Sequence, residues 1–337
     1  MKMNALLKAS LFGLVMAFTF QACSDDDDDN NGPPSQPTLT GLVESDARFS
    51  ILLDALQRTG LDATLDASGT YTVFTPTDDA FADLLAELGL ADLDEVEAAL
   101  GTEGLENILL YHVLGAEVPS GDVSTGYTKT LAANSAGNNL DLYLNASTGV
   151  TLNGNRANVS ETDLQASNGV AHVIDQVLLP LDIYQLVAVN AQFSQLNSAL
   201  LLAEGNLDQV LGDDAETYTL FAPTNAAFDS LVARTPGAND LAELVTAIGG
   251  TEVLATALLY HVVAGDVRAE DLSIGPVTTA ATDGMGANLD FNVNITGSTV
   301  TIADLSPGSP DATVTATNLT AVNGSVHIID EVLVPLP

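Results

Sequence analysis

Three sequence segments occur twice, in the same order, in this 337-residue chain, and this duplication constrains the fold more than any other feature. The segment that begins at Tyr71 recurs from Tyr218, 147 positions later. A Leu-Leu-Tyr-His-Val segment recurs after 149 positions, and an Asn-Gly segment that begins at Asn168 recurs after 155. Solenoid repeats have periods of roughly 20–50 residues. The much longer period here predicts two copies of one domain.

The predicted boundary between the copies falls near residues 180–183. It divides the chain into domain 1 (38–181) and domain 2 (182–337), each of the size of an ordinary folding unit. Almost no linker separates them, so we expect the domains to contact each other and to keep a limited range of angles. Each carries a formal charge of −17, so the acidity belongs to both surfaces.

The N-terminal sequence predicts an export signal over residues 1–22. Lys2 and Lys8 precede an apolar stretch over 9–20, and a small residue stands directly before Cys23, the one cysteine of the chain. This arrangement resembles a bacterial lipoprotein signal, in which Cys23 becomes the lipidated first residue. The alternative is an ordinary cleaved signal followed by a free cysteine.

Residues 23–37 are predicted to be a flexible acidic tether. Five adjacent aspartates, at 25–29, repel one another, and the Gly and Pro residues after them favour an extended, solvated chain. The Ser-Asp-Asp pattern also resembles the surface-export signal of lipoproteins in the Bacteroidota. We therefore expect an exported protein, lipid-anchored to the cell envelope, on the outer membrane and facing outside.

The charge balance excludes several classes of partner. The chain has 45 acidic and 8 basic residues, a formal net charge of −37. Nucleic-acid binding needs clustered Lys and Arg, so we expect no nucleic-acid partner. No basic patch is available for anionic lipid, so contact with a membrane is expected only through the lipid on Cys23. The excess of carboxylates is typical of proteins from saline habitats, where salt screens self-repulsion.

Within each copy, helical patterns come first and strand patterns follow. Thr77 stands before two aspartates and an apolar face of helical spacing, which predicts a helix start capped by Thr77. Leu140, Leu142 and Leu144 alternate with Asp141 and Tyr143, which predicts a strand. The last strands are expected over 170–179 and 326–334. Because helices and strands are segregated, the pattern favours the α+β class.

The paired segments resemble the fasciclin-type domain. Its three landmarks appear in order in both copies: Phe-Thr/Ala-Pro-Thr-x-x-Ala-Phe, Leu-Tyr-His-Val, and Asn-Gly-x-x-His-x-Ile-Asp-x-Val-Leu-x-Pro. The resemblance implies two copies of a wedge-shaped β-sandwich of about seven strands with flanking helices. It also implies an extracellular adhesion or matrix-associated role without catalysis.

The resemblance also implies candidate interaction residues. In animal members, residues around the Tyr-His motif and an Asp-Ile pair before the last Asn-Gly are linked to receptor recognition. The matching residues here are Tyr111, His112, Tyr260, His261, Asp163 and Leu164. In the second copy the acidic position is taken by Asn318. The alternative for the Tyr-His pairs is a packing role at a helix end.

No residue pattern indicates a metal, a cofactor or catalysis. The four histidines all lie inside repeated motifs, and His172 and Asp175 would point to opposite faces of one strand. We expect such a histidine to be buried and hydrogen-bonded to the backbone, with no metal bound and no cofactor. No nucleophile elbow, zinc-protease or phosphate-loop motif occurs.

Three functions remain as hypotheses. The first is a surface-anchored, non-catalytic adhesion protein that binds a cell-surface or matrix protein or a polysaccharide. The second is a carbohydrate-binding or carbohydrate-active accessory protein of the envelope. This second function would need a cluster of functional residues that is present in only one of the two domains, together with aromatic residues. The third is a structural envelope protein that assembles with itself, which strong like charge disfavours at low salt.

Overall fold

The computed structural model describes residues 36–147, 149–304 and 306–335. The predicted signal (1–22), the lipidation residue Cys23 and nearly all of the tether (23–37) lie outside these ranges. Domain 1 contains, in chain order, α1 (Leu39–Ser45), η1 (Ala47–Phe49), α2 (Ser50–Thr59), α3 (Leu61–Asp66), β1 (Tyr71–Pro76), α4 (Asp78–Leu88), α5 (Leu93–Tyr111), β2 (Val113–Leu114), η2 (Ser120–Asp122), β3 (Gly126–Ala133), β4 (Asn139–Asn145), β5 (Thr151–Leu152), β6 (Ala157–Ala166) and β7 (Gly169–Ile174).

Domain 2 repeats this order almost element for element. It contains α6 (Ile183–Ala188), η3 (Ala191–Phe193), α7 (Ser194–Leu202), α8 (Leu207–Leu211), β8 (Tyr218–Pro223), α9 (Asn225–Arg234), α10 (Leu241–Ile248), α11 (Thr251–Leu259), β9 (Val262–Ala264), β10 (Gly275–Thr282), β11 (Asn288–Thr296), β12 (Thr299–Ala303), β13 (Ala312–Ala321) and β14 (Gly324–Ile329). The duplication read from the sequence is therefore a duplication of structure.

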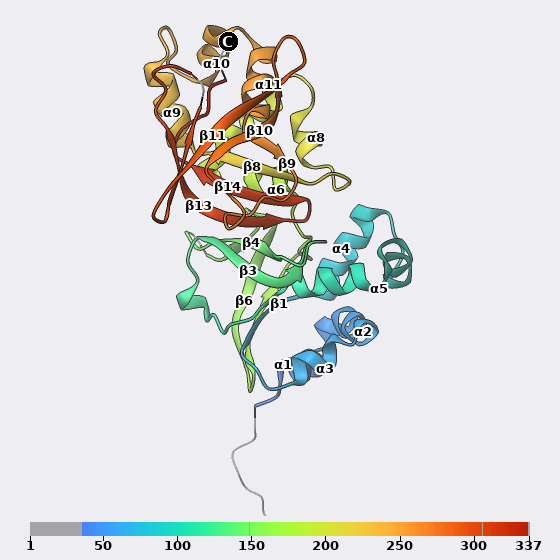
Figure 1. Ribbon diagram of the computed structural model, residues 1–337. Helices are drawn as coiled ribbons and strands as arrows, with labels where there is room; N and C mark the ends of the chain where they lie inside the picture. The colour runs from blue at the N-terminus through green and yellow to red at the C-terminus, as the bar shows by residue number, and fades with distance from the viewer. Residues whose placement is uncertain (1–35, 148, 305, 336–337) are drawn as a thin grey trace, which may run out of the picture. The chain divides into compact units, whose positions relative to one another are not determined.

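Each domain is built on seven strands with helices beside them, so the expected α+β class and strand number are confirmed. The order is β2-β1-β7-β6-β5-β4-β3 in domain 1, and domain 2 has the equivalent order β9-β8-β14-β13-β12-β11-β10. One neighbouring pair in each domain is parallel, β1 with β7 and β8 with β14, and the other pairs are antiparallel. Figure 1 shows the helices of domain 1 grouped on one side of its strands.

Strand β1 is buried on both faces, as central parallel strands usually are. Its successive residues Val73 and Phe74 point in opposite directions. Val73 packs into a cluster with the helices, and Phe74 packs into a second cluster against β4. Leu140, Leu142 and Leu144 all join that second cluster, which confirms the alternation predicted for β4. Each domain thus has two hydrophobic cores. One lies between the helices and the sheet, and the other is formed mainly by residues of the strands.

The helix start predicted at Thr77 is confirmed. The Thr77 side chain accepts a hydrogen bond from Ala80 N, and α4 begins at Asp78. Thr224 repeats this cap at the start of α9. A side-chain cap satisfies an amide that the first helical turn would leave without a partner. The local sequence was sufficient to predict this cap, because all the interacting groups lie within four residues of one another.

The last strands are shorter than predicted. Strand β7 ends at Ile174 rather than near residue 179, and β14 ends at Ile329. The cause is Asp175, whose carboxylate accepts hydrogen bonds from Asn158 N at 2.7 Å and Asn158 Nδ2 at 2.8 Å. The chain then leaves the ladder, and Leu178 N donates to His112 Nε2 instead. The apolar run after Asp175 is therefore buried loop, which periodicity alone does not distinguish from strand.

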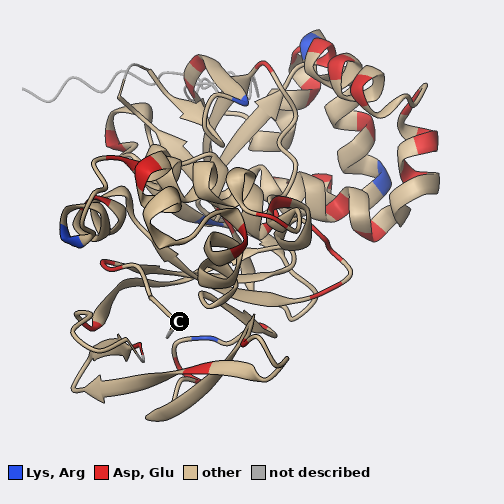
Figure 2. Ribbon diagram, turned by 90° about the horizontal axis from the view of Figure 1, so that it is seen from above, with Lys and Arg blue, Asp and Glu red and all other residues tan. Residues whose placement is uncertain are grey.

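The two domains contact each other through polar groups. Tyr127 Oη donates to the carbonyl of Leu186 at 2.8 Å, and the Asp141 carboxylate accepts from Thr320 N at 2.6 Å. Alternation places Asp141 on the outer face of β4, yet it is 3% exposed because β13 of domain 2 lies against that face. Away from this contact, acidic residues are spread over the helices and loops, with few basic residues among them (Figure 2).

Candidate functional site

The Tyr-His pairs proposed for interaction lie inside the protein. Tyr111 and His112 end helix α5, and both are buried, as are Tyr260 and His261. Tyr111 Oη donates to the Asp141 carbonyl at 2.7 Å, and Tyr260 Oη donates to the Asp290 carbonyl at the same distance. These side chains therefore supply packing and buried hydrogen bonds, and the Tyr111 hydroxyl also accepts from Asn153 Nδ2 at 3.3 Å, which is the packing alternative. An interaction role for them stays a prediction.

The two histidines join a helix end to the loop that follows the last strand. His112 Nδ1 donates to the Ile108 carbonyl at 2.8 Å, and Nε2 accepts from Leu178 N at 2.9 Å. His261 makes the equivalent bonds to Ala257 O and from Leu333 N. Full burial lowers the pKa of each imidazole to about 4, since desolvation disfavours the charged form. Both rings are neutral at physiological pH and act as structural cross-links.

Asp163 and Leu164 lie at an irregularity in β6, where the register with β7 shifts. Asp163 has a left-handed backbone (φ 62), and its N–H donates to His172 Nδ1 at 3.2 Å. Its carboxylate accepts hydrogen bonds from both Ser120 N and Ser120 Oγ. These bonds lower the pKa of Asp163. The aspartate thus fixes η2 against β6, and half-buried Leu164 follows it toward a surface pocket.

In domain 2, Asn318 takes the place of Asp163. It has the same left-handed backbone (φ 60), and its N–H donates to His327 Nδ1 at 3.3 Å. Its side-chain oxygen accepts from Ala269 N at 2.8 Å. The local geometry is therefore kept while the charge is lost. His172 and His327 also hydrogen-bond to backbone carbonyls through Nε2, as expected for buried structural histidines.

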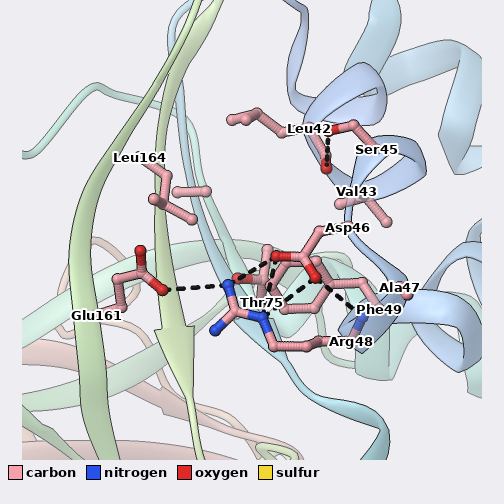
Figure 3. A pocket seen from close by; sticks show the side chains of 11 residues that line it. Leu42, Val43, Ser45, Asp46, Ala47, Arg48, Phe49, Thr75, Glu161 and Leu164 are labelled. Atoms are coloured by element: carbon pink, nitrogen blue, oxygen red, sulfur yellow. Dashed lines mark hydrogen bonds and ion pairs between the residues drawn. The ribbon is translucent and has the colours of Figure 1, made fainter.

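A pocket of about 340 Å³ opens beside Leu164, between η1 and strand β6 (Figure 3). Its apolar wall includes Leu42 and Leu164. Its polar rim is an ion-pair network in which Arg48 Nη2 lies 2.7 Å from Asp46 Oδ2 and 3.1 Å from Glu161 Oε2. Arg48 and Glu161 are 51% and 44% exposed, so a partner can reach both.

The Asp46 carboxylate in the rim is held in its ionised form. Hydrogen bonds from Arg48 lower the pKa of Asp46, whereas a general acid needs a raised one. The rim carries two negative charges, on Asp46 and Glu161, and one positive charge, on Arg48. Its net charge is therefore negative. Of the described residues, no group of three or more His, Cys, Asp or Glu is arranged to hold a metal ion.

The network of Arg48 with Asp46 and Glu161 occurs only in domain 1, and our reading of the sequence missed it. The aligned residues of domain 2 are Asn190, Gln192 and Ala316, which are all uncharged. A position-by-position comparison of the two copies would have found the difference. Proximity would still have been unknown, since Arg48 and Glu161 are 113 positions apart.

Within the described part of the chain, no single helix is long and apolar enough to cross a membrane. Taken together, helices α10 and α11 have the length and composition of a membrane-spanning segment, but the chain bends by 95° between them. Leu244, Leu254 and Leu258 of this pair are buried in the core of domain 2.

Two seven-stranded α+β domains in tandem, each with the same buried Tyr-His pair, define a duplicated module. A model of the fasciclin domain matches residues 47–180 and 191–335. The chain therefore belongs to the fasciclin-domain family.

Its similarities extend to both animal and bacterial proteins. It is 29% identical over 273 residues to pig transforming growth factor-beta-induced protein ig-h3, across 80% of this chain and 35% of that protein. It is 36% identical over 149 residues to protein sll1483 of Synechocystis, across 43% of this chain and 75% of that protein. The chain thus spans about a third of the length of the animal relative.

Among solved structures, a FAS1 domain pair from the insect cell adhesion molecule fasciclin I matches with a TM-score of 0.47 and 17% identity. The match covers 87% of this chain and 95% of that one.

Proposed function

We propose that this chain is an exported lipoprotein that uses its two fasciclin domains to bind a matrix or cell-surface protein or a polysaccharide. Cys23 would carry the lipid, and residues 24–37 would act as the tether that keeps the domains away from the membrane. The observation that carries the proposal is the fasciclin match over both domains. Fasciclin domains in relatives are linked to cell adhesion and matrix interaction.

The polar pocket of domain 1 is the surface we favour for this binding. It combines an exposed ion-pair network with the apolar side chain of Leu164. The corresponding residues of domain 2, Asn190, Gln192 and Ala316, are uncharged. Domain 1 therefore has the charged copy of this surface.

The acidic rim indicates which partners fit. Glu161 and Asp46 share Arg48, so some carboxylate lone pairs accept no hydrogen bond from it. A basic or hydroxyl group of a partner can donate hydrogen bonds to these lone pairs. The carbohydrate hypothesis required a constellation of this kind with aromatic residues beside it. Phe49 is the aromatic residue of this pocket, and at 2% exposed it offers no stacking surface. Adhesion to a basic or hydroxylated partner is therefore the better-supported function.

The test is adhesion of cells that display the full chain to immobilised matrix proteins and polysaccharides. We expect retention by at least one of these surfaces. The double variant R48Q/E161A gives domain 1 the residues that domain 2 carries, and we expect it to reduce retention severalfold. The matched control is R156Q/E87A, which removes another exposed ion pair of domain 1. Retention of wild type by none of the surfaces, at low or marine salt, would reject the adhesive function.

The anchor needs a separate measurement. Mass spectrometry of the mature chain is expected to find a fatty-acylated Cys23 at its N-terminus, and C23S is expected to release the protein from the membrane fraction. An unmodified thiol on secreted material would reject the lipid anchor and leave the adhesion test intact.

A further inference from the structure

Domain 2 contains an apolar cavity of about 190 Å³ between helices α7, α8 and α11 and strands β8 and β10. Every residue that lines it is aliphatic except Tyr218. Leu211, Leu258 and Val262 are buried and form its deep part. Half-buried side chains, including Val210, lie where it reaches the surface. The cavity is therefore an apolar hollow with a route to solvent.

Comparison of the two domains shows how the cavity arises. Ala280 of β10 lines it, and the aligned residue of β3 in domain 1 is Leu131, 149 positions earlier. Leu131 packs against the helix–sheet core of domain 1. The other walls keep their apolar character, since Leu109 and Val113 of domain 1 correspond to Leu258 and Val262. Domain 2 thus has the space that a leucine-to-alanine replacement leaves when the surroundings do not collapse.

We propose that this cavity binds a small neutral apolar molecule, one aromatic ring or an alkyl chain of similar volume. An apolar cavity of about 150 Å³ stays dry and takes up benzene or xenon. The space in domain 2 is slightly larger, which suits one ring with a short substituent. The inference is independent of the adhesion proposal, which concerns a polar surface of domain 1.

The surroundings select against charged ligands. No Lys or Arg lines the cavity, and domain 2 has only two basic residues, Arg234 and Arg268. A carboxylate at the mouth would meet a domain of formal charge −17 and would lose hydration without gaining a partner. A hydroxyl at the mouth can remain hydrated while the apolar part is buried. A neutral ring or alcohol is therefore preferred to a fatty acid of the same length.

The experiment uses residues 24–337, which include every described residue of both domains, labelled at Leu and Val methyl groups. Benzene is titrated while methyl NMR signals are recorded. We expect saturable shifts at Leu211, Leu258 and Val262, and none at their domain 1 counterparts. Hexanol is expected to bind at least tenfold more tightly than hexanoate. Absence of shifts at Leu258 and Val262 at saturating benzene would overturn the proposal, and equal binding of hexanoate would overturn its neutral-ligand part.

Two variants make the test specific to the cavity. A280L supplies the residue of the sister domain, and we expect it to abolish the benzene shifts and to leave the melting temperature equal or higher. L131A removes the corresponding side chain from domain 1, and we expect new benzene-dependent shifts at Leu109 and Val113. Unchanged binding by A280L would contradict the proposed location. If A280L fails to fold, the wild-type and L131A titrations still decide the outcome.

Discussion

Lys129 Nζ lies 2.5 Å from Asp141 Oδ2 in domain 1, and the same nitrogen donates to Asn318 O and Thr320 Oγ1 in domain 2. The Asp141 carboxylate also accepts from Thr320 N. One buried carboxylate therefore organises the contact between the domains. Burial raises the pKa of Asp141, although Lys129 and the Thr320 amide act in the opposite direction.

D141N is expected to weaken this contact, because the neutral amide loses the charge that Lys129 and Thr320 N stabilise. We expect the free energy of unfolding to fall by about 2 kcal/mol. This loss is small for a buried ion pair, because the Lys129 side chain is 45% exposed. Small-angle scattering should report a wider distribution of interdomain angles.

The matched control for D141N is D290N. Asp290 is the aligned residue of domain 2, and it is half-exposed. We expect D290N to change stability by less than about 0.5 kcal/mol. Equal effects of the two variants would contradict the role assigned to Asp141.

The buried histidines predict a pH-dependent stability. The native pKa of His112 and of His261 is about 4, below the unfolded value of 6.5. Well above pH 6.5 neither state is protonated and no stability is lost. Between pH 6.5 and 4 the unfolded chain binds protons that the native state does not, so stability falls as the pH falls. Each histidine accounts for about 3 kcal/mol by pH 4.

Urea unfolding at about pH 7, 5.5 and 4.5 measures this loss. The variant H112N should be less stable at pH 7 but should show a shallower decline, because one titrating imidazole is absent. A decline as steep as that of the wild type would show that carboxylates rather than His112 determine it.

The glycine that starts each last strand is required by close backbone packing. Gly169 has φ +150, and a Cβ there would collide with Tyr71 O; Gly324 stands in the same relation to Tyr218 O. G169A is expected to reduce the free energy of unfolding by about 3 kcal/mol. G121A is the control, because its Cβ would meet nothing within 4 Å. A melting temperature for G169A equal to that of G121A would contradict this account.

Salt should stabilise the protein because its net charge is −37. The screening length falls to about 3 Å at 1 M salt, which removes most repulsion between surface carboxylates. We expect the melting temperature to rise by about 5 °C between low salt and 1 M NaCl. KCl should act equally, since the effect is one of ionic strength. A flat or falling melting temperature would reject the saline-habitat interpretation of the composition.

The sequence by itself determined the duplication, the α+β class, the Thr77 cap and the alternation of leucines in β4. These features are local or periodic, so the interacting groups lie within a few residues or repeat at a fixed interval. The seven-stranded fold came from the family resemblance, and the structure confirms it.

Only the tertiary structure decided which polar residues are buried and which meet. Asp141 lies on the face of β4 that alternation assigns to solvent, yet a segment 179 positions away covers it. Arg48 and Glu161 form the rim of one pocket across 113 positions, and Ala280 leaves a cavity because its neighbours do not close over it. Such outcomes depend on long-range packing, in which the free energy of each contact is set by side chains distant in the sequence.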